Sequence, residues 1–390
     1  MTGAAPTVLS RASASLLTIG LVESRRDLAA FIRLPRQLYR GMPGYIAPLD
    51  FERRSLLDPR RAAFFKYGRA RYWLARRNGQ VVGRIAAQID PHAIEAWKEP
   101  IGCFGALDAA DDREAVAALV AAAAGWLRAE GMERMRGPFT LSINGETGIQ
   151  ISGQENGSMI LMPWHPPYLA GLVETTALIK AKDVLSFTLA RTGFHPVLTG
   201  EGGSLQANGL VVRGANLRKL KAELAIIVDV FNQAWRQNWG FVPLSPLEAE
   251  AIAGAIRPII NSDSAVIIEK NGRPVATALL LANVAEYIAD MDGRLFPFNW
   301  LRFLWRARRM KFKSSRLVLF GMDPALANSL EGMLIPILML QEFFDHRIRR
   351  YEAETVELGW ILEDKSLILK ILQRNGGVLT RRHRIYEAAL

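Results

Sequence analysis

Two stretches of the chain share one hydrophobic pattern: an apolar run, an Asn-Gly pair and a second apolar run. The first reads RRNGQVVGRIAAQI, with Asn78 and Gly79 at its centre. The second reads EKNGRPVATALLL and has Asn271 and Gly272 at the matching place, 193 residues further on. Asn-Gly supplies cheaply the positive φ angles that a type I′ turn needs at both central residues. Each stretch therefore predicts a β-hairpin.

The segments before the two hairpins also correspond. RQLYRGMPGYIAPL precedes the first hairpin and NQAWRQNWGFVPL precedes the second. Each places an aromatic residue and an arginine at a helix end, and then runs through Gly-aromatic-aliphatic to Pro-Leu. The matching glycines, Gly44 and Gly240, are 196 residues apart. Because the surroundings match as well as the turns, the pattern predicts two copies of one α/β unit.

The order of elements after each hairpin is also the same, as judged from apolar runs, β-branched residues and Gly or Pro punctuation. The first half predicts strand 101–107, helix 111–130, strand 132–139, helix 167–176 and strand 184–190. The second half predicts strand 317–321, helix 330–350, strand 356–362, helix 366–374 and strand 378–386. The halves differ in their inserts, 140–165 and 284–315. We therefore predict two domains, 1–198 and 217–390, joined by a linker rich in Gly and Asn at 199–216.

Charge and cysteine content narrow the class of protein. The formal net charge of +11 over 390 residues favours a polyanionic partner, such as nucleic acid, anionic membrane, an acidic carrier protein or a phosphorylated cofactor. The single cysteine, Cys103, excludes an internal disulfide, fits a reducing compartment and lies in an apolar strand where burial is expected. The first residues make a poor signal peptide, and no run of eighteen apolar residues occurs. We expect a cytoplasmic protein.

The predicted order of elements matches the acyl-CoA N-acyltransferase (GNAT) fold. The runs MPWHPPYLAGLVE, NWGFVPLSPLE, GRLFPF and VELGWILEDKSLILKIL resemble a bacterial family built from two such domains, with the bacterial ceramide synthases among its neighbours. The resemblance covers nearly the whole chain. It implies an α/β fold of two tandem GNAT-like domains, each a mixed, mostly antiparallel sheet flanked by helices.

The same resemblance implies an enzyme that transfers a fatty acyl group to a lipid amine, such as a sphingoid base. The acyl-CoA co-substrate is one donor that fits, and an acyl carrier protein is another. The alternative is a catalytically inactive GNAT-like module that binds lipid or an acyl carrier protein. No metal is expected, and no Ser-His-Asp arrangement, metal-ligand cluster or phosphate-binding Walker loop is recognisable.

In the GNAT fold the donor pyrophosphate lies on backbone N–H groups that open the long helix. The first half has LDAADDRE there, and its carboxylates at Asp108, Asp111 and Asp112 would repel a phosphate. The second half has GMDPALANSLEGML, without the usual paired glycines. We therefore expect the donor in the second half only, with candidate contacts from Gly321, Met322, Asn328, Ser329 and Gly332. The alternative is a plain helix N-terminus.

Amide formation needs an unprotonated amine, a polarised thioester carbonyl and a proton for the leaving thiolate. The loop LSINGETGIQISG…MPWHPPYLAG, which runs into the start of helix 167–176, is stiffened by prolines and carries Glu146, His165 and Tyr168, which are candidates for proton transfer. Glu363, at the carboxyl end of strand 356–362, is a fourth candidate. The structural alternatives are that Glu363 and Asp364 cap the next helix, and that His165 and Tyr168 satisfy backbone groups at the domain junction. Substrate-binding candidates are Asn144, Asn238, Trp239, Glu357, Trp360 and Asp364.

A basic and aromatic segment, FNWLRFLWRARRMKFK at 298–313, lies in the second insert. It holds six basic residues and no acidic residue, with aromatic and aliphatic side chains between them. This composition is typical of a helix in a membrane interface, so it predicts reversible attachment to the anionic inner face of the cell membrane. The alternative is a cover helix with solvated arginines. Nucleic-acid binding is less favoured, because no nucleic-acid module accompanies the segment.

Overall fold

Strands and helices follow one another in the order that the hydrophobic pattern predicts. A computed structural model describes residues 16–191, 209–309, 311–326, 329–343 and 353–390. The strands are β1 (Leu17–Leu21), β2 (Arg69–Arg77), β3 (Gln80–Ile89), β4 (Ile101–Ala109), β5 (Arg134–Gly137), β6 (Ile149–Ser152), β7 (Ile179–Ala190), β8 (Leu210–Gly214), β9 (Ala265–Lys270), β10 (Arg273–Ala282), β11 (Ser314–Met322), β12 (Thr355–Leu362) and β13 (Val378–Ala389). The helices are α1 (Arg25–Tyr39), α2 (Asp50–Leu57), α3 (Pro91–Trp97), α4 (Arg113–Ala129), α5 (Pro167–Val173), α7 (Leu220–Trp235), α8 (Pro246–Ile256), α9 (Ala285–Ile288), α10 (Asn299–Arg309), α11 (Leu330–Glu342) and α13 (Ser366–Arg374).

Both predicted hairpins are confirmed. β2 and β3 are antiparallel around Asn78 and Gly79, whose φ angles are 51° and 83°. β9 and β10 are antiparallel around Asn271 and Gly272, whose φ angles are 52° and 78°. The two turns have the positive φ angles that Asn-Gly favours, and this local preference sets the register of each hairpin.

Side-chain caps fix where several helices begin. The Asp112 carboxylate accepts a hydrogen bond from the Ala115 backbone N–H and starts α4. Ser245 and Glu248 form a reciprocal capping box at the start of α8. The predicted helix at 366–374 is confirmed as α13. The predicted helix at 330–350 forms α11, and 344–352 lie outside the described residues.

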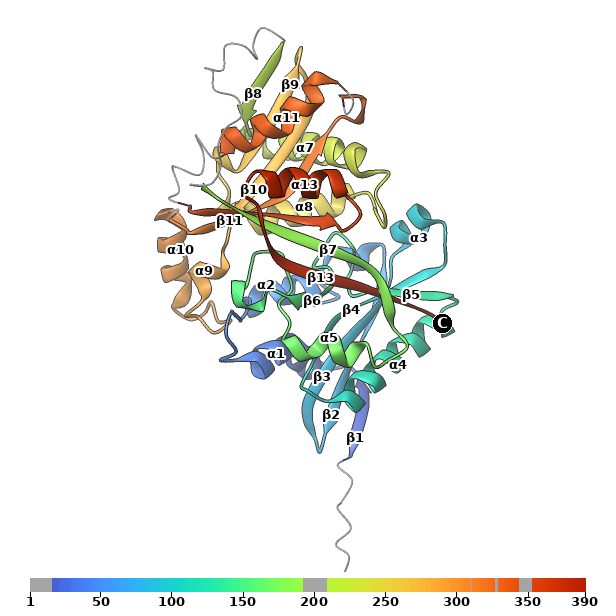
Figure 1. Cartoon of the computed structure of the whole chain (residues 1–390). Helices are drawn as coiled ribbons and strands as arrows, with labels where there is room; N and C mark the ends of the chain where they lie inside the picture. The colour runs from blue at the N-terminus through green and yellow to red at the C-terminus, as the bar shows by residue number, and fades with distance from the viewer. Residues whose placement is uncertain (1–15, 192–208, 310, 327–328, 344–352) are drawn as a thin grey trace, which may run out of the picture.

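The two halves exchange their last strands. The described strands form a single thirteen-stranded sheet in the order β1-β2-β3-β4-β5-β13-β7-β12-β11-β10-β9-β8, with β6 beside β13. Thus β13, from the end of the chain, pairs with β5 of the first half, while β7 of the first half pairs with β12 of the second. Figure 1 shows these two long strands crossing between the halves. Only β4–β5 and β11–β12 are parallel pairs, so the predicted mixed, mostly antiparallel sheet is confirmed.

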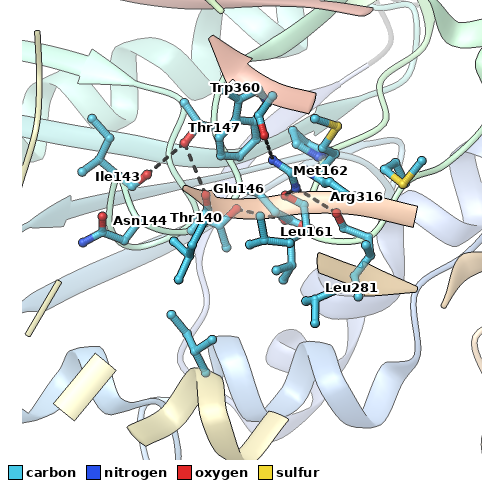
Figure 2. Close-up of a pocket in the computed structure, with 18 of the residues that line it drawn as sticks. Thr140, Ile143, Asn144, Glu146, Thr147, Leu161, Met162, Leu281, Arg316 and Trp360 are labelled. Carbon is cyan, nitrogen blue, oxygen red and sulfur yellow. Dashed lines mark hydrogen bonds between the residues drawn. The ribbon is translucent and has the colours of Figure 1, made fainter. Parts of the chain in front are cut away.

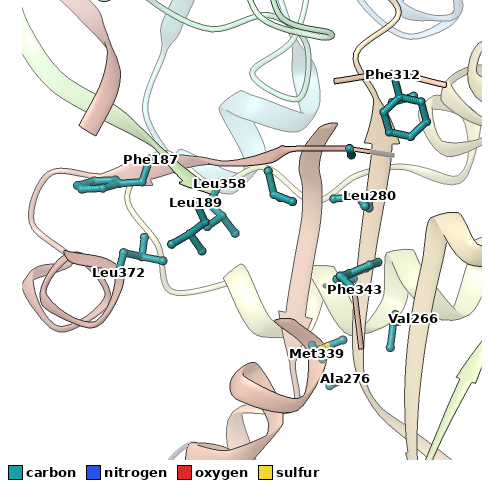
Figure 3. Close-up of a cluster of buried hydrophobic side chains, with 14 of the residues drawn as sticks. Phe187, Leu189, Val266, Ala276, Leu280, Phe312, Met339, Phe343, Leu358 and Leu372 are labelled. Atoms are coloured by element: carbon teal, nitrogen blue, oxygen red, sulfur yellow. The ribbon is translucent and has the colours of Figure 1, made fainter. Parts of the chain in front are cut away.

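The hydrophobic core of each half also contains side chains from the last strand of the other half. Phe187 and Leu189 of β7 belong to the core of the second half, together with Leu358 and Leu372 (Figure 3). In return, Tyr386 of β13 belongs to the core under α4 in the first half. Cys103 is buried as expected, and burial raises the pKa of its thiol. Each half therefore needs a strand of the other to complete its core.

The structure differs from two expectations that were drawn from the sequence. The halves do not form separate sheets, because β7 and β13 join them into one. The stretch 199–216, predicted as a linker, includes β8 at the edge of the sheet beside β9. Local patterns identified the strands but carried no information about which half each last strand joins.

Candidate functional site

The strands β11 and β12 separate and open a site in the second half. They pair in parallel only as far as Leu317 and Leu358. Beside this point β11 has a bulge, since Leu279 and Leu280 of β10 face Leu319 and Leu317 and leave Val318 unopposed. Beyond it, 318–322 and 359–362 line a cavity. The two strands are thus splayed beyond Leu317 and Leu358.

The corresponding strands of the first half stay closer together. Their parallel pairing ends at Cys103 and Arg136, but the Phe139 backbone N–H still donates to the Phe104 carbonyl over 2.7 Å. The Phe139 side chain is fully buried beside Cys103. The gap between β4 and β5 is therefore filled at this level by the protein itself.

The cavity has a volume of about 2010 Å³ and draws its walls from both halves. The insert 140–165 of the first half lines it together with β11, β12, α8 and α13 of the second. Figure 2 shows Asn144, Glu146 and Leu161 from the insert with Arg316 and Trp360 from the two splayed strands. Of the predicted site residues, the cavity brings together Asn144, Glu146, His165, Asn238, Trp239, Gly321, Met322, Gly332 and Trp360.

Glu146 belongs to a charged cluster in the cavity wall. Its carboxylate accepts two hydrogen bonds from the Arg53 guanidinium, at 2.6 and 2.5 Å, and one from the Thr140 hydroxyl at 3.1 Å. Burial raises the pKa of Glu146, but attraction to Arg53 outweighs it and holds the pKa below its usual range. Glu52 contacts the same guanidinium at 3.2 Å, and burial raises its pKa. Two carboxylates thus share one guanidinium, which leaves the cluster with one excess negative charge.

His165 is a buried, neutral imidazole. Its Nδ1 accepts a hydrogen bond from the Gln150 backbone N–H at 3.2 Å, so the ring proton lies on Nε2. Burial lowers the pKa of His165, which keeps this tautomer at neutral pH. The side chain lines the cavity. His165 can therefore donate a hydrogen bond into the cavity, whereas a general base would need a free lone pair on Nε2.

Five predicted residues with described positions do not line the cavity: Ser329, at the start of α11, and four that make contacts elsewhere. The Tyr168 hydroxyl donates to the Ala109 carbonyl at 2.9 Å, which is the backbone contact that the structural alternative anticipates. Glu363 accepts from Lys180 Nζ at 2.7 Å and from the Asp183 backbone N–H. Asp364 accepts from Lys182 Nζ at 3.1 Å. Glu357 is buried in an ion pair with Arg381, at 2.9 Å. A role for these four in catalysis or substrate binding stays a prediction.

The start of α11 is the predicted cradle for a donor phosphate. Ser329 Oγ accepts from the Gly332 backbone N–H at 3.0 Å and donates to the Leu326 carbonyl. Glu331, which interrupts the usual motif, is paired with Lys270 at 2.6 Å. Asn328 lies outside the described residues. In the first half, Arg84 pairs with Asp108, and Asp112 occupies the first N–H groups of α4, so that helix start is already capped.

Sequence reasoning missed Arg316. It is the one charged residue of β11, whose sequence is SSRLVLFGM, and it is only 2% exposed. Its guanidinium lies 4.7 Å from the centroid of the Trp360 ring. A lone arginine inside an apolar strand is the signal that could have identified it, because such residues are rarely buried without a partner.

Most of the basic segment forms α10, and several of the segment's apolar side chains are exposed, whereas Phe312 is buried. Phe298, Leu301 and Trp305 are 74%, 52% and 55% exposed. Phe296, next to the helix, contacts Phe51, which lines the cavity. Arg302 and Arg306 both pair with Asp290, and the Arg302 side chain remains half exposed. The described residues include no cluster of His, Cys, Asp and Glu suited to a metal ion, and none of their helices could cross a bilayer.

Two curated relatives match nearly the whole chain. Protein YghO of Escherichia coli strain K12 is 34% identical over 373 residues, covering 94% of this chain and 95% of that protein. Bacterial ceramide synthase of Caulobacter vibrioides strain NA1000 / CB15N is 33% identical over 382 residues, covering 96% and 98%. No family model matches the chain.

Solved structures show the same fold. A tandem GNAT protein from the clavulanic acid biosynthesis pathway superposes with a TM-score of 0.56 at 12% identity, covering 96% of this chain and 98% of that one. A probable N-acyltransferase from Enterococcus faecalis V583 gives a TM-score of 0.52 at 8% identity, covering 96% and 73%. At such low identity these likenesses concern the fold alone.

Proposed function

Because the chain belongs to the bacterial ceramide synthase family of tandem GNAT N-acyltransferases, we propose that it transfers a fatty acyl group from acyl-CoA to a lipid amine such as a sphingoid base. The observation that carries the proposal is the size of the cavity. Pockets for drug-sized ligands measure about 300–1,000 Å³. At about 2010 Å³ this cavity has room for more than one long chain, and its walls are mainly apolar.

The acidic cluster suits the amine. A sphingoid base is an ammonium ion at neutral pH, and the excess negative charge of Glu52, Arg53 and Glu146 would attract it. Of the two carboxylates, Glu52 has the raised pKa and is the better proton acceptor. Glu146, with its lowered pKa, would stay ionised and hold Arg53 in place.

The splay between β11 and β12 suits the donor. Gly321 and Met322 on one strand and Gly332 at the start of α11 line the cavity there. A Cβ on Gly321 would lie 3.0 Å from the backbone of Phe231, so a side chain at this position would crowd α7. Since the cradle at α11 is reduced, the donor would be held mainly through its acyl chain. An acyl carrier protein could present the same thioester.

The reaction then needs few groups from the protein. The ammonium gives a proton to Glu52, and the free nitrogen attacks the thioester carbon. Collapse of the tetrahedral adduct breaks the C–S bond, and the thiolate leaves with the proton released from nitrogen, so one amide and one thiol are formed. The His165 Nε2–H is available to polarise the thioester carbonyl.

The substrate would be collected at a membrane surface. Phe296, which precedes α10 in the chain, contacts Phe51 in the cavity wall, and Arg308 and Arg309 are exposed at the end of the helix. This arrangement supports peripheral attachment to an anionic membrane on the cytoplasmic side. A lipid amine would then have a short path from the bilayer into the site.

The test is turnover of palmitoyl-CoA with sphinganine by the purified protein, measured as N-acyl product by mass spectrometry and as released thiol. We expect both in equal amounts. His165→Phe should lower kcat about 100-fold or more, while Tyr287→Phe is the matched control because Tyr287 is buried outside the cavity wall. Binding of lipid without any thiol release would instead support the inactive module, the second candidate that the reduced cradle favours.

A further inference from the structure

Arg316 lies in β11 close to the point where β11 and β12 separate. It is the last but one residue of β11 that pairs with β12, facing Glu357 in the register, and the strands separate immediately beyond it. Its side chain lines the cavity and is almost fully buried. The guanidinium therefore lies in the cavity wall where the two strands begin to separate, near Trp360 of β12 (Figure 2).

Among the described residues, only neutral groups accept hydrogen bonds from Arg316. Nη1 donates to the carbonyls of Ile160 and Leu161 at 2.8 and 2.7 Å, and Nη2 donates to the Gly359 carbonyl at 3.2 Å. Nε is buried and has no hydrogen-bond partner. Three of the five N–H groups of a guanidinium are thus used, and none of them reaches a carboxylate.

The neighbouring carboxylates are already paired with other arginines. Glu357 is held by Arg381 at 2.9 and 3.1 Å, and Glu146 is held by Arg53. Within the described parts of the chain, Arg316 makes no ion pair. Burial lowers the pKa of Arg316 to about 10, so it still carries its charge at neutral pH. A buried cation without a counter-ion is costly, and it is retained at sites that meet negative charge.

Acyl transfer creates such a charge once in each cycle. When the amine attacks, the neutral thioester oxygen becomes an oxyanion, and a fixed cation in a water-poor wall stabilises that state more than the ground state. We propose that Arg316 is a catalytic residue that stabilises the oxyanion of the tetrahedral adduct at the splay of β11 and β12. This inference rests on the proposed acyl transfer and names a group that carries its transition state.

The experiment compares two stable ligands. One is the hexadecylphosphonamidate of sphinganine, whose P–O⁻ group copies the oxyanion, and the other is the palmitoyl amide, whose carbonyl is neutral. Arg316→Gln should weaken binding of the phosphonamidate about 100-fold and change binding of the amide less than threefold. Equal weakening of both ligands would show that Arg316 only clamps the insert to β12, and unchanged binding of both would also overturn the proposal.

Arg316→Lys covers the case in which the glutamine variant does not fold. It keeps the positive charge but loses the planar fork that contacts three carbonyls, so the preference for the phosphonamidate should persist within about tenfold of the parent protein. Loss of that preference in a folded lysine variant contradicts the proposal. If the parent protein binds neither ligand, both the proposed acyl transfer and the role of Arg316 are overturned. If the parent protein binds both ligands but the variants do not show the expected preferences, only the role of Arg316 is overturned.

Discussion

At the scale of single residues, burial and neighbouring groups together set the charge states of the residues that line the cavity. His165 is neutral with its proton on Nε2, Glu146 is ionised beside Arg53, and Arg316 is charged and forms no ion pair with any residue that the structure describes. The sequence pointed to His165 and Glu146 because a proline-stiffened insert crowds them together. It could not give their roles, since these depend on Gln150 for the tautomer and on Arg53, 93 residues away, for the charge.

The effect of burial on the pKa of a histidine can be tested at His383, through the pH dependence of the free energy of unfolding. It is fully buried, Nε2 contacts the Pro163 carbonyl at 3.1 Å and Nδ1 has no partner. Burial lowers the pKa of His383 to about 3, below the ordinary 6.5. The unfolded chain therefore binds the proton first, and the free energy of unfolding should fall as the pH drops below about 6.5, by up to about 1.4 kcal/mol per pH unit from this group.

Urea unfolding at pH 7, 6 and 5 would measure this slope. His383→Gln keeps a donor for Pro163 but cannot be protonated, so its stability should fall less steeply with acid. Other buried groups, including His165, add to the slope in both proteins, and only the difference between parent and variant counts. Parallel slopes would mean that His383 is charged or exposed in the folded state.

At the scale of elements, α10 is a helix with two unlike sides. Arg302 and Arg306 fold back onto Asp290, whereas Phe298, Leu301 and Trp305 project from the surface. We expect the protein to float with anionic vesicles and to be released as salt rises, because charges are screened beyond about 8 Å at physiological ionic strength. Arg308→Gln with Arg309→Gln should remove about 2 kcal/mol, or roughly thirtyfold in partitioning.

Changing Phe298 and Trp305 to Ser should weaken flotation on neutral vesicles too. The matched control is Ile179→Ser, which removes an equally exposed apolar side chain from β7, far from α10 in the chain. If the control and the α10 variants float alike, then α10 is only a cover helix. The basic and aromatic composition of the segment predicted this helix, but only the fold shows that Arg302 and Arg306 pair with Asp290.

At the scale of the whole molecule, the exchange of β7 and β13 makes the halves interdependent. β13 runs between β5 and β7, and Phe187 and Tyr386 each complete the core of the other half. Residues 1–198 expressed alone should therefore lack a cooperative thermal transition, and co-expression with 199–390 should recover a complex that purifies as one species. A first half that unfolds cooperatively as a monomer would contradict this expectation.

The sequence by itself determined everything that depends on neighbouring residues. Asn-Gly pairs set the two hairpins, Asp112 and Ser245 set helix starts, and the repeated pattern set the duplicated order of elements. These features follow from backbone dihedral preferences and caps, which act over a few residues.

Only the tertiary structure decided which half each last strand joins, and with it the cavity. A strand carries the same alternation whichever edge it pairs with, so β7 and β13 could not be assigned to a half from their own residues. The same holds for Arg316. The sequence shows an arginine in a mainly apolar strand, but it does not show whether a carboxylate pairs with this arginine. Folding decides that, because it brings Glu357 opposite Arg316 and pairs Glu357 with Arg381 instead. Long-range pairing of strands and charges is a property of the assembled fold, and here it is what builds the site.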